Sequence, residues 1–241
     1  MDTKSENISN LDSVLVLGSL NVDFVAYCID DQLPLPGQTV IGTLFEKNYG
    51  GKGANQAVQV SRLNCPVTML GKVGPDDFGK NYLEHLKTNE NVNIKYINEA
   101  YDVSTGIAQI TVSSAGENCI IIIPGANNEV DIEYAEEALN AALTTTEDTS
   151  SSSSSKGKPQ ILLLQNEIPL ETSIYAMRWA HENNIRCIFN PAPAPSDPTE
   201  LRLLYSSLKS SNCMIDIICP NETELASLTG TSHPSVLLLE H

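Results

Sequence analysis

The segment Tyr49-Gly50-Gly51-Lys52-Gly53-Ala54-Asn55-Gln56-Ala57 decides which fold and which kind of site the chain can form. Its three glycines within four positions allow a tight turn and leave no side chain between the backbone and a ligand. Good helix-forming residues follow at 54–63, so we expect a helix that begins directly after the turn. A helix start offers unpaired N–H groups and the positive end of the helix dipole, and Lys52 and Asn55 add a charge and an amide there. These features predict a site for a polar, oxygen-rich ligand.

Two common phosphate-binding patterns do not fit this segment. The Walker A pattern requires a glycine where Glu46 stands, and a serine or threonine where Gly53 stands. The dinucleotide pattern Gly-x-Gly-x-x-Gly could start at Gly51, but Gln56 occupies its last position, which argues against a nicotinamide-dependent oxidoreductase. A tight turn with a purely structural role is the alternative for these glycines.

Composition limits the class of protein. A chain of 241 residues allows one large domain, or one domain with a small appendage. The formal net charge of −16 argues against nucleic acids and anionic membranes as partners, because both require clustered Lys and Arg. Six scattered cysteines, a polar start and the lack of a membrane-length apolar run predict a cytoplasmic protein, with a nuclear location also open.

Short strands that alternate with helices predict an α/β fold. Continuous apolar runs at 14–17 and 161–164 indicate central, buried strands. Further strands are expected at 67–70, 186–189 and 215–219, and helices at 54–63, 77–87, 131–143, 173–183, 201–209 and 222–228. This alternation predicts a doubly wound, mostly parallel sheet flanked by helices. The half-exposed strand pairs at 24–45 and 107–123 interrupt it, and we expect them to form one small β-sheet lid over a ligand crevice.

Short polar residues follow the two central strands. Gly18-Ser19-Leu20-Asn21-Val22-Asp23 comes after the first, and Gln165-Asn166-Glu167 ends the other. In open α/β sheets the crevice at the carboxyl ends of the strands binds ligands. On sequence alone, Asp23 is as good a turn-former as a ligand, and Glu167 would serve equally as a helix cap.

Four motifs together resemble ribokinases, a group within the PfkB-type sugar kinases. They are Gly18-Ser19-Leu20-Asn21-Val22-Asp23, Gly50-Gly51-Lys52-Gly53-Ala54-Asn55-Gln56-Ala57, Asn190-Pro191-Ala192-Pro193-Ala194 and Pro220-Asn221-Glu222-Thr223-Glu224. They stand in the family's order and cover roughly residues 13–230. The resemblance implies ATP-dependent phosphorylation of D-ribose at its primary hydroxyl, with Mg²⁺ and, in the family, a monovalent cation such as K⁺. It also implies a homodimer formed through the lid strands.

The resemblance assigns roles to individual residues. The positions that match the family's sugar-binding residues are Asn21, Asp23, Gly50, Gly51, Lys52, Asn55 and Glu167. Asn190, Asn221 and Glu224 match positions near the nucleotide, and Glu224 would organise Mg²⁺ through water. Outside the resemblance, Asn221 is equally well explained as a helix N-cap, and Asn190 as a turn residue.

One family motif is absent from the sequence. Ribokinases carry their catalytic aspartate in Gly-Ala-Gly-Asp, and these 241 residues contain no such segment, so no catalytic residue is assigned. The family's monovalent-cation loop has no counterpart either. We therefore expect an incomplete, C-terminally truncated ribokinase-like domain at 13–230 that is inactive alone, with a non-catalytic sugar-binding or regulatory fragment as the alternative.

The expected domain organisation follows from these segments. Residues 1–12 are expected to form a disordered tail, and residues 231–241 an end unrelated to the family. The lid segments run over about 23–48 and 104–124. The Ser- and Thr-rich stretch at about 144–158 is low-complexity, and we expect a disordered insertion there, with a phosphorylated regulatory tract as the alternative.

Overall fold

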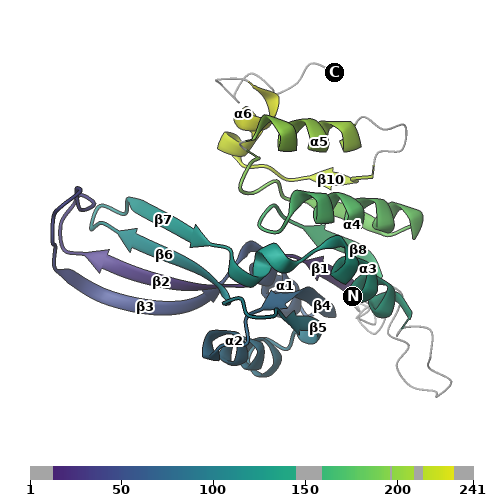
Figure 1. Cartoon of the computed structure of the whole chain (residues 1–241), viewed down its shortest axis with the longest axis horizontal. Helices are drawn as coiled ribbons and strands as arrows, with labels where there is room; N and C mark the ends of the chain where they lie inside the picture. Colours follow the sequence, from purple (N-terminus) through teal and green to yellow (C-terminus); the bar gives the residue numbers. More distant parts are fainter. Residues whose placement is uncertain (1–12, 145–158, 196, 209–213, 231–241) are drawn as a thin grey trace, which may run out of the picture.

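A six-stranded, fully parallel sheet forms the centre of the protein (Figure 1). The computed structural model describes residues 13–144, 159–195, 197–208 and 214–230. The expected end segments 1–12 and 231–241 lie outside these ranges, as does the expected insertion at about 144–158 except for Thr144, which ends a helix. The strand order is β10-β9-β8-β1-β4-β5. The bounds are β1 Ser13–Leu17, β4 Val67–Val73, β5 Asn93–Glu99, β8 Pro159–Leu164, β9 Arg186–Phe189 and β10 Ile217–Ile218. The predicted parallel sheet is confirmed.

Helices cover both faces of this sheet because successive residues of the central strand point to opposite sides. Val14 and Val16 pack in one apolar cluster with residues of α1 and α2, whereas Leu15 and Leu17 pack in another with residues of α3 and α4. The helices are α1 Lys52–Arg62, α2 Asp77–Thr88, α3 Ile132–Thr144, α4 Leu170–Glu182, α5 Pro198–Leu208 and α6 Glu222–Thr229. The sheet is therefore doubly wound, and no helix of the described ranges is long and apolar enough to cross a membrane.

A second sheet of four strands projects from the first as a long arm (Figure 1). Its order is β3-β2-β6-β7, and its strands are β2 Asn21–Cys28, β3 Gly42–Gly50, β6 Gly106–Val112 and β7 Asn118–Ile123. β2 pairs antiparallel with β3 and parallel with β6, and β6 pairs antiparallel with β7. The two strand pairs that interrupted the predicted alternation thus join into one small sheet, as expected.

Some elements differ from the prediction. β3 extends to Gly50, so the glycine turn is a single residue, Gly51, between a strand and a helix. β5 was not predicted, because this edge strand contains mostly polar residues and exposes Asn93, Lys95 and Asn98. Among its residues only Ile97 is buried. The short 3₁₀ helix η2, Gly125–Glu129, was also missed; it links β7 to α3.

Asp76 connects the helical layer to the root of the small sheet. As the N-cap of α2 it accepts a hydrogen bond from the Gly79 N–H at 2.8 Å. It also accepts bonds from the Thr105 N–H at 2.8 Å and the Thr105 hydroxyl at 2.7 Å, directly before β6. Burial opposes ionisation, but these hydrogen bonds together hold the pKa of Asp76 below its usual value.

We expect Asp76→Ala to lower the free energy of unfolding by about 2–3 kcal/mol, because it removes a helix cap and the anchor of Thr105. Urea unfolding followed by circular dichroism measures this change. Asp77→Ala, at an exposed neighbouring position of α2, is the matched control and should stay within about 0.5 kcal/mol of the wild type. Equal stability of the two variants would contradict the anchoring role.

Candidate functional site

The carboxyl ends of β1 and β8 form the topological switch point of the main sheet. From β1 the chain continues to β4 and β5 on one side, whereas β8, β9 and β10 lie on the other. Glu167 follows β8 and Ser19 follows β1, and the Ser19 hydroxyl donates to Oε2 of Glu167 at 2.6 Å. Open α/β sheets bind ligands at this place, so the two residues mark the candidate site.

The start of α1 also reaches this point. The Lys52 N–H donates to Oε2 of Glu167 at 2.9 Å, and the Gly53 N–H donates to the Ser19 hydroxyl at 3.2 Å. The Ala54 N–H donates to the Ser19 carbonyl at 3.0 Å. The expectation of unpaired N–H groups at the helix start is therefore wrong for these three donors. Gly51, the N-cap, has no side chain, and a carboxylate 115 positions away in sequence takes over the capping.

The glycines of the turn permit close approach of three segments. Gly51 has φ +88°, and a Cβ there would lie 2.7 Å from the Asn21 nitrogen. A Cβ at Gly53 would lie 2.6 Å from the Ser19 nitrogen, and one at Gly50 would overlap the Asp23 carboxylate. A side chain at Gly51 or Gly53 would push α1 away from the end of β1, so packing requires these two glycines, whereas Gly50 leaves room for the Asp23 carboxylate.

The Asp23 carboxyl is partly buried and lies within electrostatic reach of Glu167. Burial, and secondarily the negative charge of Glu167, raise the pKa of Asp23 to about 6. No ion pair within the described ranges neutralises either carboxylate. Two carboxylates thus share one partly buried region, which suits a ligand that donates hydrogen bonds from neutral groups.

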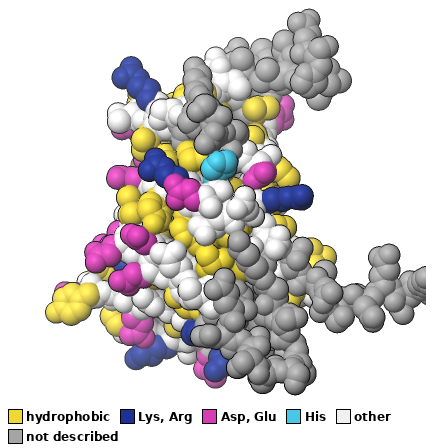
Figure 2. Space-filling view, turned by 90° about the vertical axis from the view of Figure 1, so that its right-hand side faces the viewer, with side chains coloured by type: hydrophobic (Ala, Val, Ile, Leu, Met, Phe, Trp, Pro, Cys, Tyr) yellow, Lys and Arg dark blue, Asp and Glu magenta, His cyan; other side chains and the backbone are white. Residues whose placement is uncertain are grey.

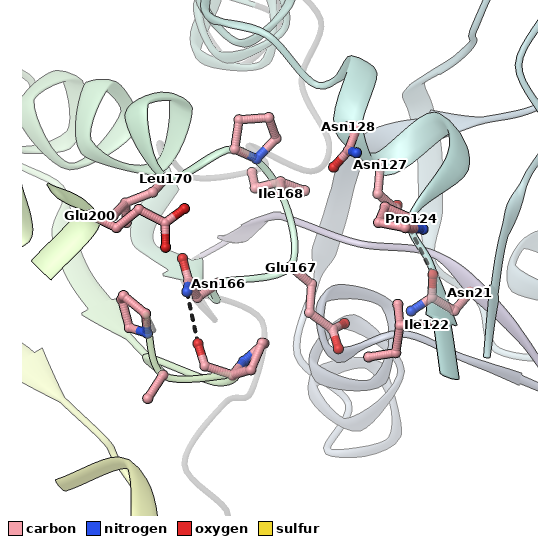
Figure 3. Close-up of a pocket in the computed structure, with 14 residues that line it drawn as sticks. Asn21, Ile122, Pro124, Asn127, Asn128, Asn166, Glu167, Ile168, Leu170 and Glu200 are labelled. Carbon is pink, nitrogen blue, oxygen red and sulfur yellow. Dashed lines mark hydrogen bonds between the residues drawn. The ribbon is translucent and has the colours of Figure 1, made fainter. Parts of the chain in front are cut away.

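An open cavity of about 360 Å³ lies beside Glu167 (Figure 3). Glu167 points into its centre, with Asn21, Ile122 and Asn127 on one side and Asn166 and Glu200 on the other. The carboxylates that line the cavity accept hydrogen bonds and the amides both donate and accept, whereas isoleucine and proline side chains form an apolar part of the wall.

The predicted sugar-side residues fall into two groups. Asn21 and Glu167 line the cavity, and they form the first group. The second group adjoins the cavity residues or Asp23: Gly51 lies against Asn21, the Lys52 N–H donates to Glu167, and Gly50 lies against Asp23. Asn55 is exposed one helical turn after Gly51, and its backbone N–H donates to the Gly51 carbonyl at 2.9 Å. No hydrogen bond or ion pair within the described ranges engages the Lys52 ammonium or the Asn55 amide, so both groups are open to a ligand.

The predicted nucleotide-side residues lie farther along the same edge of the sheet and do not line the cavity. Asn190 follows β9, and its Nδ2 donates to the Cys219 carbonyl at 2.6 Å. Asn221 caps α6 in a reciprocal capping box, in which its N–H and Nδ2 donate to the two oxygens of Glu224 at 2.8 and 3.0 Å. The N-cap role expected as an alternative for Asn221 is confirmed.

These contacts also test whether the residues fit a metal ion. Glu224 is buried and uses both carboxylate oxygens within the capping box. Among the described residues, no group of three or more His, Cys, Asp or Glu side chains could hold a metal ion. The described residues therefore contain no ready-made cluster of metal ligands, and Asn221 already donates to both oxygens of Glu224.

Sequence reasoning missed two buried polar residues at the site. Ser19 is fully buried and joins Glu167 to α1, although it stood inside a motif already singled out. Asn127, in η2, is also buried and bonds to Asn21 at 2.7 Å. No sequence pattern pointed to Asn127, because its partners lie 106 and 107 positions earlier in the chain.

Comparison with known proteins identifies the family. The model of the pfkB family of carbohydrate kinases matches residues 11–240. The chain belongs to this family. Among pfkB-type relatives, a deoxyribokinase of Salmonella typhi is 36% identical over 220 residues, which cover 90% of the chain and 62% of the relative. A mouse ribokinase is 34% identical over 221 residues, which cover 90% of the chain and 59% of the relative.

Solved structures of pfkB-type kinases agree with the fold. The ribokinase from Giardia lamblia superposes with a TM-score of 0.73 at 28% identity, covering 92% of the chain and 61% of that protein. The Arabidopsis thaliana ribokinase complexed with ribose and ATP superposes with a TM-score of 0.66 at 30% identity, covering 91% and 63%. The chain thus spans 59% to 63% of the length of these four relatives.

The raised pKa of Asp23 predicts a pH-dependent stability. Between the usual aspartate pKa of 3.8 and about 6, the native state binds more protons than the unfolded state. This contribution of Asp23 to stability is fully present below 3.8 and is lost as pH rises through 6. Asp23→Asn, which cannot ionise, should therefore raise the free energy of unfolding at neutral pH by about 1 kcal/mol, after allowance for solvent screening.

Chemical denaturation of the wild type and Asp23→Asn from pH 4 to 8 measures this difference. We expect the gain to disappear towards pH 4, where Asp23 of the wild type is protonated. Asp77→Asn is the exposed control. A gain that is constant over the whole range, or absent at neutral pH, would contradict the burial of a carboxylate beside Glu167.

Proposed function

We propose that the chain forms the sugar-binding part of an ATP-dependent kinase that phosphorylates D-ribose at its primary hydroxyl, giving ribose 5-phosphate. The observation that carries this proposal is the convergence of Ser19, Glu167 and the start of α1 at the switch point, with Asp23 within electrostatic reach. A pentose presents several hydroxyls that each donate and accept hydrogen bonds, so it suits fixed carboxylates and amides. The related Arabidopsis structure contains ribose and ATP, which supports the choice of ligands.

The proposed roles follow from the chemistry of each side chain. Asp23 and Glu167 accept hydrogen bonds from sugar hydroxyls, and Lys52 and Asn55 donate to hydroxyl oxygens. Glu167 already receives two donors on Oε2, so Oε1 is the atom left for the sugar. This array would hold the ring so that its primary hydroxyl faces the nucleotide, and such positioning is the main contribution of proteins to phosphoryl transfer.

The nucleotide side of the proposed reaction belongs to Asn190, Asn221 and Glu224. They follow β9 and β10, so they lie along the same carboxyl edge as the sugar side. Because the protein carries a net charge of −16, the triphosphate would need local neutralisation that its overall charge does not provide. Glu224 would help to hold Mg²⁺ through ordered water rather than as a direct ligand, because Asn221 already donates to both of its oxygens.

A second function, sugar binding without turnover, is favoured by one specific observation. The 241 residues contain no Gly-Ala-Gly-Asp segment, which carries the catalytic base in the ribokinases that the chain resembles. Loss of a general base and of its neighbouring anion-stabilising groups typically costs several powers of ten in rate. We therefore expect the 241-residue chain to bind ribose but to release no ADP above background in a coupled assay. Turnover comparable to that of a full-length relative would contradict this expectation.

Isothermal titration calorimetry with D-ribose tests the binding function directly, with 2-deoxyribose as a second ligand because a related protein is a deoxyribokinase. Glu167→Gln keeps an oxygen that accepts from Ser19 and Lys52 but removes the charge, and we expect it to weaken ribose binding about tenfold or more. Glu171→Gln, at an exposed position of α4, is the matched control and should bind as the wild type does.

Absence of a heat signal for both sugars with the folded wild-type chain would refute the proposed ligand class. Equal affinity of Glu167→Gln and Glu171→Gln would instead remove Glu167 from the site. Thermal unfolding of all three proteins shows whether a loss of binding reflects a loss of folding.

We also propose that the chain forms a homodimer through its small sheet. All four isoleucines of β7, Ile120 to Ile123, are 45–60% exposed, and β7 is an edge strand. Leu44 and Phe45 on the opposite edge strand, β3, are 53% and 61% exposed. Figure 2, which shows a different face, has charged side chains scattered around an apolar patch. Exposed apolar side chains on an unpaired edge are an interface or an aggregation hazard.

Ile121→Lys should convert the dimer to a monomer, because it places a charge within the apolar edge. Ile121 does not line the cavity, so the substitution should leave the cavity unchanged. Analytical ultracentrifugation measures the change in mass. Ile132→Lys, at a 40% exposed position of α3 outside the small sheet, should remain dimeric. A monomeric wild type, or a dimeric Ile121→Lys, would refute this interface.

A further inference from the structure

The Asn127 side chain is buried at the root of the small sheet and uses its whole amide there. It lies in η2, directly after β7, and is 1% exposed. Its Oδ1 accepts from the Leu20 N–H at 2.8 Å, and its Nδ2 donates to the Leu20 carbonyl at 3.2 Å. The same Nδ2 donates to Oδ1 of Asn21 at 2.7 Å. Asn127 thereby clamps the segment that leads from β1 into β2.

This network fixes which end of each amide points where. A backbone N–H can only donate, so the atom of Asn127 that faces the Leu20 N–H must be its oxygen. The nitrogen of Asn127 then faces Asn21, which must present its own oxygen in return. The orientation of the Asn21 amide is therefore determined by a backbone group that cannot change its role.

The fixed orientation of the Asn21 amide determines which of its atoms faces the cavity. Asn21 lines the cavity and is 3% exposed, and its Nδ2 makes no hydrogen bond to any part of the chain that the structure describes. In Figure 3 the Asn21 nitrogen points away from Asn127, on the side where Glu167 lies. The Asn21 nitrogen is therefore a hydrogen-bond donor at the cavity wall, open to a ligand oxygen or to water.

We propose that Asn127 is a positioning residue that holds the Asn21 side chain with its nitrogen towards the cavity, so that the site offers a fixed hydrogen-bond donor to a ligand oxygen. This inference rests on the proposed function for the identity of the ligand. The Asn21 nitrogen adds a hydrogen-bond donor to a region in which the ionised carboxylates of Asp23 and Glu167 can only accept. A sugar hydroxyl that donates to a carboxylate can then accept from Asn21, whereas a ligand with an amino group in that place would be disfavoured.

Close packing makes this arrangement rigid. A Cβ at Gly106, the first residue of β6, would overlap the amides of both Asn21 and Asn127 and lie 2.8 Å from the Leu20 carbonyl. The Ala126 N–H donates to the Ser104 carbonyl at 2.8 Å, which joins η2 to the segment before β6. The clamp therefore lies where three segments of the small sheet meet the main body, and it ties the donor at Asn21 to the position of that sheet.

Side-chain amide exchange, followed by ¹⁵N NMR on the ligand-free chain, tests the orientation without any sugar. The NH₂ protons of Asn127 should exchange at least about tenfold more slowly than those of Asn21, which face the open cavity. The opposite order would overturn the proposal.

Asn127→Asp tests whether the orientation is imposed by Asn127. The carboxylate still accepts from Leu20 but cannot donate to Asn21, so Asn21 should turn its nitrogen towards Asp and its NH₂ exchange should slow about tenfold. Asn98→Asp, the same change at an exposed position of β5, should leave Asn21 unaltered. Unchanged exchange at Asn21 in folded Asn127→Asp would overturn the proposal.

Asn21→Asp keeps the clamp intact, because an oxygen still faces Asn127, but it removes the donor from the cavity. We expect a folded protein with protected Asn127 protons and a Kd for D-ribose at least about tenfold weaker than that of the wild type. Wild-type affinity in this variant would refute the donor role. A wild-type chain that binds no ribose would refute the proposed function alone, since the exchange experiments decide the orientation independently.

Discussion

The rest of the site depends on the hydrogen bonds that the Glu167 carboxylate accepts. One of its oxygens accepts from the Ser19 hydroxyl and from the Lys52 N–H, so it joins the ends of β8 and β1 to the start of α1. A second link supports it two residues earlier, where Nε2 of Gln165 donates to Oε1 of Gln56 at 2.6 Å. The glycines at 51 and 53 are the condition for this meeting, because any side chain there would meet the backbone of residues 18–21. The glycines at 51 and 53 thus serve the packing of α1 against the end of β1.

This arrangement has an electrostatic consequence. Glu167 and Ser19 accept from the first N–H groups of α1, which a phosphate would otherwise bind, and Glu167 places negative charge at the positive end of the helix dipole. Burial, and to a smaller extent the negative charge of Glu167, raise the pKa of Asp23, so Asp23 binds protons more tightly. Negative charge in this region disfavours anions, which agrees with the proposal that the sugar binds here and the nucleotide binds at the ends of β9 and β10.

Much of the fold was predictable because its signals are local. Apolar runs mark the central strands, Asp76 marks the start of α2, and the half-exposed strand pairs indicated a separate small sheet. β5 was missed because an edge strand carries mostly polar residues. The position of Glu167 after β8 made it a candidate, yet its role as the cap of a helix 115 residues earlier depends on tertiary packing that no local pattern encodes. Asn127 escaped for the same reason, since every partner of its side chain is distant in sequence.

The most direct test of the account is a crystal structure of the chain grown with D-ribose. Its central claim is that Asp23, Lys52, Asn55 and Glu167, which come from β2, α1 and the end of β8, act on one pentose. The account predicts sugar density beside Glu167, with hydroxyl oxygens within about 3.2 Å of the Asp23 and Glu167 carboxylates and of Nδ2 of Asn21. Ribose bound elsewhere, or in the cavity without contact to either carboxylate, would contradict it.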